Sequence, residues 1–136
     1  QKGCAEVLAE GTYAALFAIG SMVETAWQVR KKLAEKGIPT TVVNARFAMP
    51  LDKNCLRKLA ESHPLLVTME ENVASGGFGE HVAAFLEEEA LHTKVLRIAI
   101  PDCFVEHGSV GELKKALGLD ADSVTEKILA ELPEEL

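Results

Sequence analysis

Three short runs without charge, two of them mostly apolar and one rich in β-branched residues, constrain the fold of this chain more than any other feature. Each is followed by a pattern of helical periodicity. The runs cover residues 13–20, 40–44 and 65–69 and contain no charged side chain. Strands that are apolar on both faces are typical of a parallel sheet covered by helices on each side. Alternating strands and helices, joined by right-handed crossovers, therefore predict a three-layer α/β/α domain.

Two further strands complete the expected sheet. Residues 5–9 alternate weakly and no helix follows them. We expect this segment to be an antiparallel strand at one edge, because an antiparallel edge strand also protects that edge. Residues 95–100 form the last strand, which ends before Pro101 and Asp102. The prediction is a five-stranded, mixed, mostly parallel sheet.

Capping signals predict where the helices begin and end. Ser21 and Glu24 form a capping-box pattern at the start of the first helix, and Gly37 suits its carboxyl end. Asp52 and Asp120 are suitable N-caps for two later helices. One face of the first helix is apolar at helical spacing and consists of Met22, Ala26, Val29 and Leu33.

Two more helices are expected in the second half of the chain. The helix after the glycine turn at residues 76–79 should bury Val82, Phe85 and Leu86. Ser109 and Glu112 form a second capping-box pattern, which predicts a short helix that ends near Gly118.

Length and composition limit the classes of function. A chain of 136 residues suits one domain, spanning residues 1–136. The formal net charge of −7 argues against nucleic acid or a membrane surface as the main partner. No apolar run is long enough to span a membrane, and we expect a cytoplasmic location. The chain begins at Gln1 and enters a strand pattern almost at once, as expected of a piece of a longer protein.

Cysteines and histidines give little sign of a reactive or metal-binding site. Three widely spaced cysteines without a C-x-x-C motif argue against a disulfide framework or a zinc site. Cys103 lies close to His107 in the sequence, but no nucleophile motif surrounds the pair. His107 follows an acidic residue and precedes a glycine in a loop, so either a defined polar contact or a plain surface position fits it.

The segment from Glu70 to Asn72 places two carboxylates and an amide directly after a buried strand. An acid–base pair would need the two carboxyl groups to be held close together. Adjacent residues of a strand point to opposite faces, so Glu70 and Glu71 are not expected to work as a pair. The favoured interpretation is a structural or interface role, in which one carboxylate accepts backbone N–H groups or pairs with an arginine.

The glycine turn formed by Gly76, Gly77, Phe78 and Gly79 has two interpretations. It could bind an anion at the start of the following helix, although nearby glutamates would repel phosphate. Alternatively, the glycines allow the turn to pack closely against a neighbour. Three loops leave the carboxyl ends of the predicted strands, where ligands bind in open α/β sheets. These loops could converge, and Arg46 could then meet Glu70 or Glu71.

Eight segments, in the right order and at matching spacing, point to a known family. With these segments, the chain resembles the carboxy-terminal domain of the 1-deoxy-D-xylulose-5-phosphate synthase family. That domain is one of the transketolase C-terminal-type domains. The EHG segment and the LGLD ending favour the synthase over related transketolase and pyruvate dehydrogenase β-subunit domains. The segments are AIGSMV (18–23), VNARF (43–47), PLD (50–52), VTMEEN (67–72), GGFG (76–79), PD (101–102), EHG (106–108) and LGLD (117–120).

The resemblance implies a fold and an enzyme. The fold is a five-stranded mixed sheet with its first strand antiparallel. The whole enzyme would condense pyruvate with glyceraldehyde 3-phosphate, release carbon dioxide, and use thiamine diphosphate and Mg²⁺. Its product would serve isoprenoid, thiamine and pyridoxal phosphate synthesis. In the family the cofactor pocket belongs to other domains, and this chain lacks their Gly-Asp-Gly motif. The resemblance therefore assigns no catalytic, cofactor-binding or metal-binding residue to this chain.

The resemblance also implies partners. They are the remaining domains of the same enzyme and its homodimer mate, so this domain would serve assembly and dimerisation and be inactive alone. The alternatives are a regulatory or small-anion-binding module, or the equivalent domain of another transketolase-family enzyme. The residues expected to have docking or structural roles are Arg46, Glu70, Glu71, Asn72, Gly76, Gly77, Phe78, Gly79 and His107.

Overall fold

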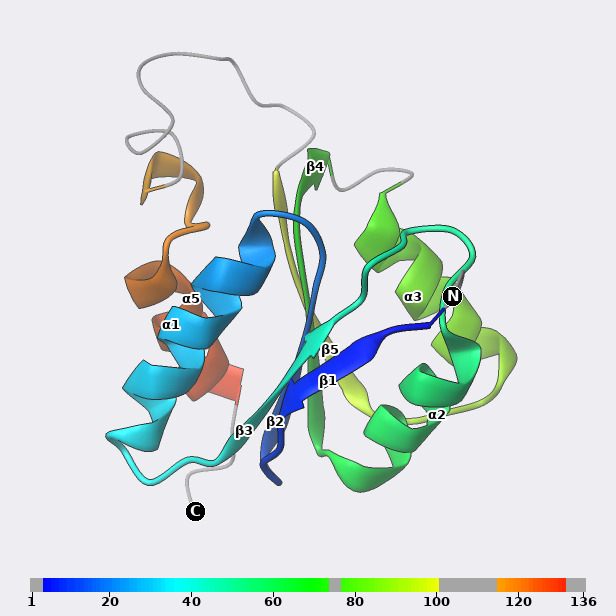
Figure 1. The fold of residues 1–136 in the computed structure, drawn as a ribbon, viewed down its shortest axis with the longest axis horizontal. Coiled ribbons are helices and arrows are strands. Elements are labelled where there is room, and N and C mark those ends of the chain that lie inside the picture. The colour runs from blue at the N-terminus through cyan, green and yellow to red at the C-terminus, as the bar shows by residue number, and fades with distance from the viewer. Residues whose placement is uncertain (1–3, 74–76, 101–114, 132–136) are drawn as a thin grey trace.

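A computed structural model describes residues 4–73, 77–100 and 115–131. They form one five-stranded sheet with helices on both faces (Figure 1), which confirms the predicted α/β/α fold class. The elements are β1 (Glu6–Ala9), β2 (Ala14–Ala18), α1 (Met22–Ala34), β3 (Thr40–Asn44), α2 (Lys53–Ser62), β4 (Leu65–Val73), α3 (Phe78–Glu88), β5 (Lys94–Ile100) and α5 (Ala121–Glu131).

The strand order is β1-β3-β2-β4-β5. As predicted, β1 lies at an edge and pairs antiparallel with β3, whereas the other neighbouring strands are parallel. Leu16, in the middle of β2, lies beside Val42 of β3 and Val67 of β4. Every residue of β2 is buried, as expected of a central strand covered on both faces.

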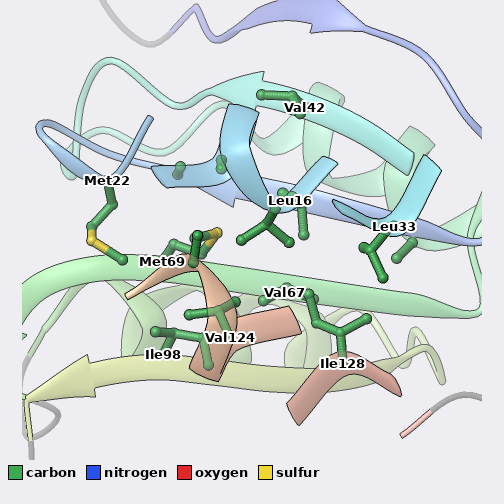
Figure 2. Packing of buried hydrophobic residues seen from close by; sticks show 14 of the residues in the cluster. Leu16, Met22, Leu33, Val42, Val67, Met69, Ile98, Val124 and Ile128 are labelled. Carbon is green, nitrogen blue, oxygen red and sulfur yellow. The ribbon is translucent and has the colours of Figure 1, made fainter. Parts of the chain in front are cut away.

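The helices cover the sheet in two pairs, and each pair encloses its own apolar cluster. On one face, α1 and α5 pack over Leu16, Val67 and Ile98 (Figure 2). On the other face, α2 and α3 pack over Phe17, Val43 and Leu66. The two pairs lie on opposite sides of the sheet in Figure 1. The predicted apolar face of α1 is fully buried, which confirms its helical register.

The capping box predicted for α1 is wrong. Ser21 has helical backbone angles, and its side chain makes no capping hydrogen bond. The reason is local: Gly20 has a φ of 62°, and the resulting turn lets the N–H groups of Met22 and Val23 donate to the carbonyls of Ile19 and Gly20. The first donors of the helix are therefore already satisfied by the backbone, and a serine oxygen is not needed.

The other described helix ends agree with the prediction. Gly37 has a φ of 76°, and its N–H donates to the carbonyl of Ala34 while the N–H of Ile38 reaches back to Leu33. This pair of bonds is the Schellman arrangement, which favours glycine at that position. At the start of α2, the carboxylate of Asp52 accepts the N–H of Cys55 at 3.0 Å.

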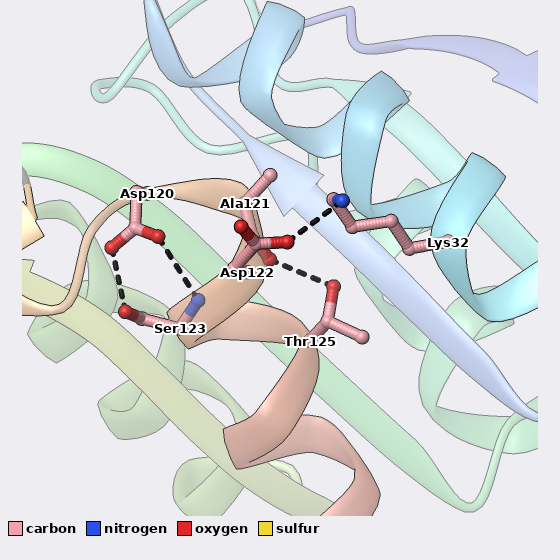
Figure 3. Close-up of polar contacts among 6 residues, drawn as sticks. All are labelled: Lys32, Asp120, Ala121, Asp122, Ser123 and Thr125. Atoms are coloured by element: carbon pink, nitrogen blue, oxygen red, sulfur yellow. Dashed lines mark hydrogen bonds and ion pairs between the residues drawn. The ribbon is translucent and has the colours of Figure 1, made fainter.

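Polar contacts fix the start of α5 and join it to α1 (Figure 3). The carboxylate of Asp120 accepts the hydroxyl of Ser123 at 2.6 Å and its N–H at 3.2 Å. Burial alone would raise the pKa of Asp120, but these hydrogen bonds outweigh it and lower the pKa. Asp122 pairs with Lys32 of α1 at 2.7 Å, and its hydrogen bond and charge raise the pKa of Lys32. Both groups of this pair are exposed, so it adds little stability.

Several strand boundaries differ from the prediction. β1 begins at Glu6, and β2 is shorter than the run 13–20 because it covers only Ala14–Ala18. β4 continues four residues beyond Met69, through Glu70 and Glu71 to Val73, and β5 begins at Lys94. The register between β4 and β5 shifts between Met69 and Val73, because four residues of β4 span the distance that two residues of β5 span. The strand therefore bulges where the two carboxylates lie.

The capping box predicted at Ser109 and Glu112 lies outside the described residues. Among the helices that the structure describes, none is both long and apolar enough to cross a membrane.

The central position of Leu16 gives a direct test of this fold. We expect Leu16→Ala to lower the free energy of unfolding by about 2–5 kcal/mol, because the cavity would lie between the sheet and α1. The control is Val7→Ala, at a residue that is 49% exposed. It should change the free energy of unfolding by about 0.5 kcal/mol or less. Urea unfolding followed by circular dichroism measures both changes. Equal losses in the two variants would contradict the described burial.

Candidate functional site

The carboxyl group of Glu70 joins the end of β4 to the start of α3. One oxygen accepts the N–H of Phe78 at 2.9 Å, and the other accepts the N–H of Gly79 at 2.5 Å. The Glu70 side chain is fully buried. Both bonds go to N–H groups of the first helical turn, which have no partner within the helix. Glu70 is thus the N-terminal cap of α3, supplied by a residue eight positions earlier in the sequence.

The local sequence explains this arrangement. The residue at the usual capping position is Gly77, which has no side chain with which to accept a hydrogen bond. Glu70 lies in the bulge at the end of β4, where the regular pairing of β4 with β5 is interrupted. A buried carboxylate would be costly without compensation, but the positive end of the helix and two aligned N–H groups provide it. The prediction that one carboxylate accepts backbone N–H groups is confirmed.

Gly79 shows why the turn needs glycine. A Cβ atom at this position would lie 2.8 Å from both Glu70 Oε2 and Thr68 Oγ1, and 3.1 Å from Arg97 Nε. No real Cβ atom tolerates contacts under about 3 Å without movement of its neighbours. The interpretation of the turn as a place of close approach is therefore confirmed at Gly79. The first helical N–H groups are occupied by Glu70, so they are not available to an external anion.

Phe78 belongs to the core. Its side chain is 2% exposed, and its ring stacks on Phe17 with the centroids 5.3 Å apart. Of the two roles foreseen for Phe78, docking or structural, the structure supports the structural one. The Glu70 cap and the Phe78 stack thus fix the same helical turn from two sides.

The exposed part of the edge consists of other residues. Glu71 is exposed, on the strand position next to the buried Glu70. Arg46 is also exposed, with a φ of 66°; its N–H donates to the Asn44 side chain and its guanidinium lies over the Phe47 ring. Its described contacts do not include Glu70, so the first of the two expected pairings is not seen, and a pairing with Glu71 stays a prediction.

The remaining predicted residues are described in part or lie outside the description. Gly77 occupies the N-cap position of α3, where the capping oxygens come from Glu70 instead. The backbone of Asn72 is part of β4, and its side chain lies outside the described part of the structure. Gly76 and His107 lie outside the described residues.

Sequence reasoning treated His63 only as a helix stop, but the structure shows a buried hydrogen-bonding centre. Nε2 lies 2.8 Å from Thr41 Oγ1 and 2.9 Å from the carbonyl oxygen of Gly11, and Nδ1 lies 3.0 Å from the carbonyl oxygen of Leu59. His63 therefore joins the turn before β2 to β3 and to the end of α2. Its position directly before Pro64, where a helix must end, was the only signal in the sequence.

The chemistry available at this edge is limited. Glu70 is buried and bound by backbone N–H groups, and Glu71 is exposed, so the two do not form an acid–base pair. No group of three or more histidine, cysteine, aspartate or glutamate side chains in the described ranges could hold a metal ion. The described residues offer no cluster of metal ligands for Mg²⁺, and Glu70 already binds the N–H groups of Phe78 and Gly79, where a diphosphate could otherwise meet the start of α3.

Comparison with known proteins decides the family. The family model described as "Transketolase, C-terminal domain" matches residues 3–124. The chain belongs to this family. Transketolase C-terminal domains also have the same fold: a split-gene transketolase, described as an inactive β4 tetramer, superposes with a TM-score of 0.89 at 31% identity over 96% of this chain and 42% of that chain. A transketolase from Campylobacter jejuni, at 19% identity over 96% of this chain and 19% of its own, has a TM-score of 0.66.

Curated relatives of this transketolase C-terminal domain are named 1-deoxy-D-xylulose-5-phosphate synthase, which confirms the resemblance. The protein from Lachnoclostridium phytofermentans is 54% identical over 93% of this chain, and one from Geobacter metallireducens is 46% identical over 93%. The chain spans about a fifth of the length of these relatives, since it covers 20% of each.

The buried cap predicts a specific effect of removing its charge. Glu70→Gln would leave one backbone N–H facing an NH₂ group, so we expect a loss of about 2–3 kcal/mol of unfolding free energy. Amide hydrogen exchange at Phe78 and Gly79 should also become faster, because the first turn would open more often. Glu87→Gln, an exposed change on the same helix, is the matched control. Equal stability of both variants would contradict the capping role.

Gly79 allows helix propensity and close packing to be separated. Propensity alone makes Gly79→Ala stabilising by about 1 kcal/mol. We expect the opposite, a loss of about 1–3 kcal/mol, because the new methyl group would overlap Glu70 and Thr68. Thermal unfolding of Gly79→Ala, Thr68→Ala and the double variant measures the coupling. The two changes should be less than additive, and a more stable Gly79→Ala protein would refute the close contact.

Proposed function

We propose that this chain is the carboxy-terminal domain of a 1-deoxy-D-xylulose-5-phosphate synthase, with residues 1–136 forming one domain of a longer cytoplasmic enzyme. The observation that supports it best is the 54% identity to a synthase of which the chain spans only 20%. The longer enzyme would be a thiamine diphosphate-dependent transferase that condenses pyruvate with glyceraldehyde 3-phosphate and releases carbon dioxide for isoprenoid, thiamine and pyridoxal precursors. Thiamine diphosphate and Mg²⁺ would bind to its other domains.

In this proposal the domain serves assembly and dimerisation. Its partners are the remaining domains of the same enzyme and the homodimer mate. The carboxyl edge of the sheet suits docking because Arg46 is exposed in the loop after β3 and Glu71 is exposed on β4. Glu71 is next to Glu70, whose hydrogen bonds fix the end of β4 to the start of α3. A surface that is ordered before binding loses less conformational entropy on association.

The proposal includes catalytic inactivity of the isolated chain. A relative at 31% identity is described as an inactive β4 tetramer of a split-gene transketolase, which supports the same property here. The alternative function, a small-anion-binding module, is less well supported. Its best candidate site was the start of α3, where Glu70 already accepts the N–H groups of Phe78 and Gly79.

The test is restoration of activity in trans. We expect the chain alone to show no turnover with pyruvate, glyceraldehyde 3-phosphate, thiamine diphosphate and Mg²⁺. Addition of the chain to a Lachnoclostridium synthase that lacks its own carboxy-terminal domain should restore carbon dioxide release. Turnover by the chain alone would refute inactivity, and failure to restore activity would refute the assembly role.

Charge reversal at the exposed edge sharpens this test. We expect Arg46→Glu to raise the concentration of chain needed for half-maximal restoration by about tenfold, a cost of about 1.4 kcal/mol. Lys36→Glu, an exposed reversal beyond the other end of α1, is the matched control and should have little effect. If both variants behave alike, the docking surface lies elsewhere.

A further inference from the structure

The three methionines of this chain differ sharply in exposure. Met22 and Met69 are 0% exposed in the core, whereas Met49 is 65% exposed. Exposed thioethers are the ones that oxidants reach, because oxygen transfer requires direct contact with the sulfur. We infer that Met49 is a modification site, at which peroxide-type oxidants convert the side chain to methionine sulfoxide while Met22 and Met69 stay reduced.

The surroundings of Met49 give this change a consequence. Met49 lies in the loop after β3, beside Pro50 and Leu51, and lines an open groove of about 300 Å³ against α3. Phe85 of α3 also lines this groove, and Lys53 lies over its ring with the ammonium 5.7 Å from the centroid. An oxidised sulfur here places a polar oxygen on a mainly apolar surface.

The inferred selectivity is among the three methionines. Burial raises the pKa of the Cys55 thiol to about 11, so it stays protonated at neutral pH and reacts slowly with peroxide. Cys4 is partly buried, and Cys103 lies outside the described residues. Thioethers carry no proton that must first be lost, so access to the sulfur decides which methionine reacts.

The chemical step is balanced with a hydroperoxide as the only co-reactant. A lone pair of the Met49 sulfur attacks the terminal peroxide oxygen, a sulfur–oxygen bond forms and the oxygen–oxygen bond breaks. The sulfur is oxidised by two electrons and the peroxide is reduced to water or an alcohol. Methionine sulfoxide reductases reverse this change.

A functional effect of this oxidation rests on the docking role proposed above. The groove adjoins the same loop as Arg46 at the carboxyl edge. Sulfoxide at Met49 would therefore weaken docking to the remaining domains, since burial of a polar oxygen without a partner costs free energy.

The modification itself is tested by mass spectrometry. The three methionines fall in three separate tryptic peptides, covering residues 3–30, 47–53 and 59–94. During limited treatment of the folded chain with hydrogen peroxide, we expect Met49 in the peptide 47–53 to gain one oxygen at least about tenfold faster than Met22 and Met69. Fragment ions assign each added oxygen to its residue, because the peptide 3–30 also contains Cys4. Equal rates, or faster oxidation of Met22 or Met69, would overturn the inference.

Two controls make the result specific. In urea the three peptides should be oxidised at similar rates, because unfolding removes the difference in access. In Met49→Leu the fast event should disappear, and the other two peptides should keep their slow rates in the folded protein. Persistence of a fast single oxidation in that variant would assign it to another residue.

A second measurement separates this inference from the proposed function. Peroxide-treated chain should restore the truncated synthase about tenfold less well, and sulfoxide reductase should recover the loss. Peroxide should cause no such loss in Met49→Leu relative to its own untreated sample. Selective oxidation without any effect on restoration would overturn the link to docking but keep the modification site. Failure of the untreated chain to restore activity would instead refute the proposed function.

Discussion

The rest of the carboxyl edge depends on one interaction, the pairing of the buried Glu70 carboxylate with the first N–H groups of α3. It fixes the position of that helix relative to β4, and so the cluster that α2 and α3 cover. A carboxylate is rarely fully buried in a protein, because its desolvation is costly. Here two hydrogen bonds and the helix dipole compensate that cost, so the interaction also specifies a single orientation of the helix.

The neighbouring residues are compatible with this pairing. Glycine fits at position 79 because Glu70 and Thr68 occupy the space that a Cβ atom would need, and the ring of Phe78 stacks on Phe17. The glycine turn resembles an anion site in sequence, since glycines precede a helix start in both cases. The difference is that this protein supplies its own anion. A motif that suggests ligand binding therefore proves to be an internal cap, and binding chemistry must be sought among the exposed neighbours.

Regular periodicity in the sequence made most of the fold predictable. The local backbone geometry of the turns and loops could not be predicted in this way. The sequence pattern predicted β3 at its observed bounds, β2 (Ala14–Ala18) within the run 13–20, and the buried face of α1. Burial on two faces or along one stripe leaves a clear pattern. The Ser21 cap failed because the turn at Gly20 satisfied the helix start by itself. The separation of Arg46 from Glu70 could not be foreseen either, since sequence gives the order of loops but not their directions.

One short motif combines a stabilising residue with a residue of the proposed docking surface. Glu70 is buried and bound, whereas Glu71, the next residue along β4, is exposed. The inward residue fixes the turn, and the outward residue lies on a surface that is already ordered. Evolutionary change at the outward position would alter partner contacts at little cost to folding, whereas change at the inward position would release α3. For this reason the stability of the domain and its assembly should respond to different residues of the same motif.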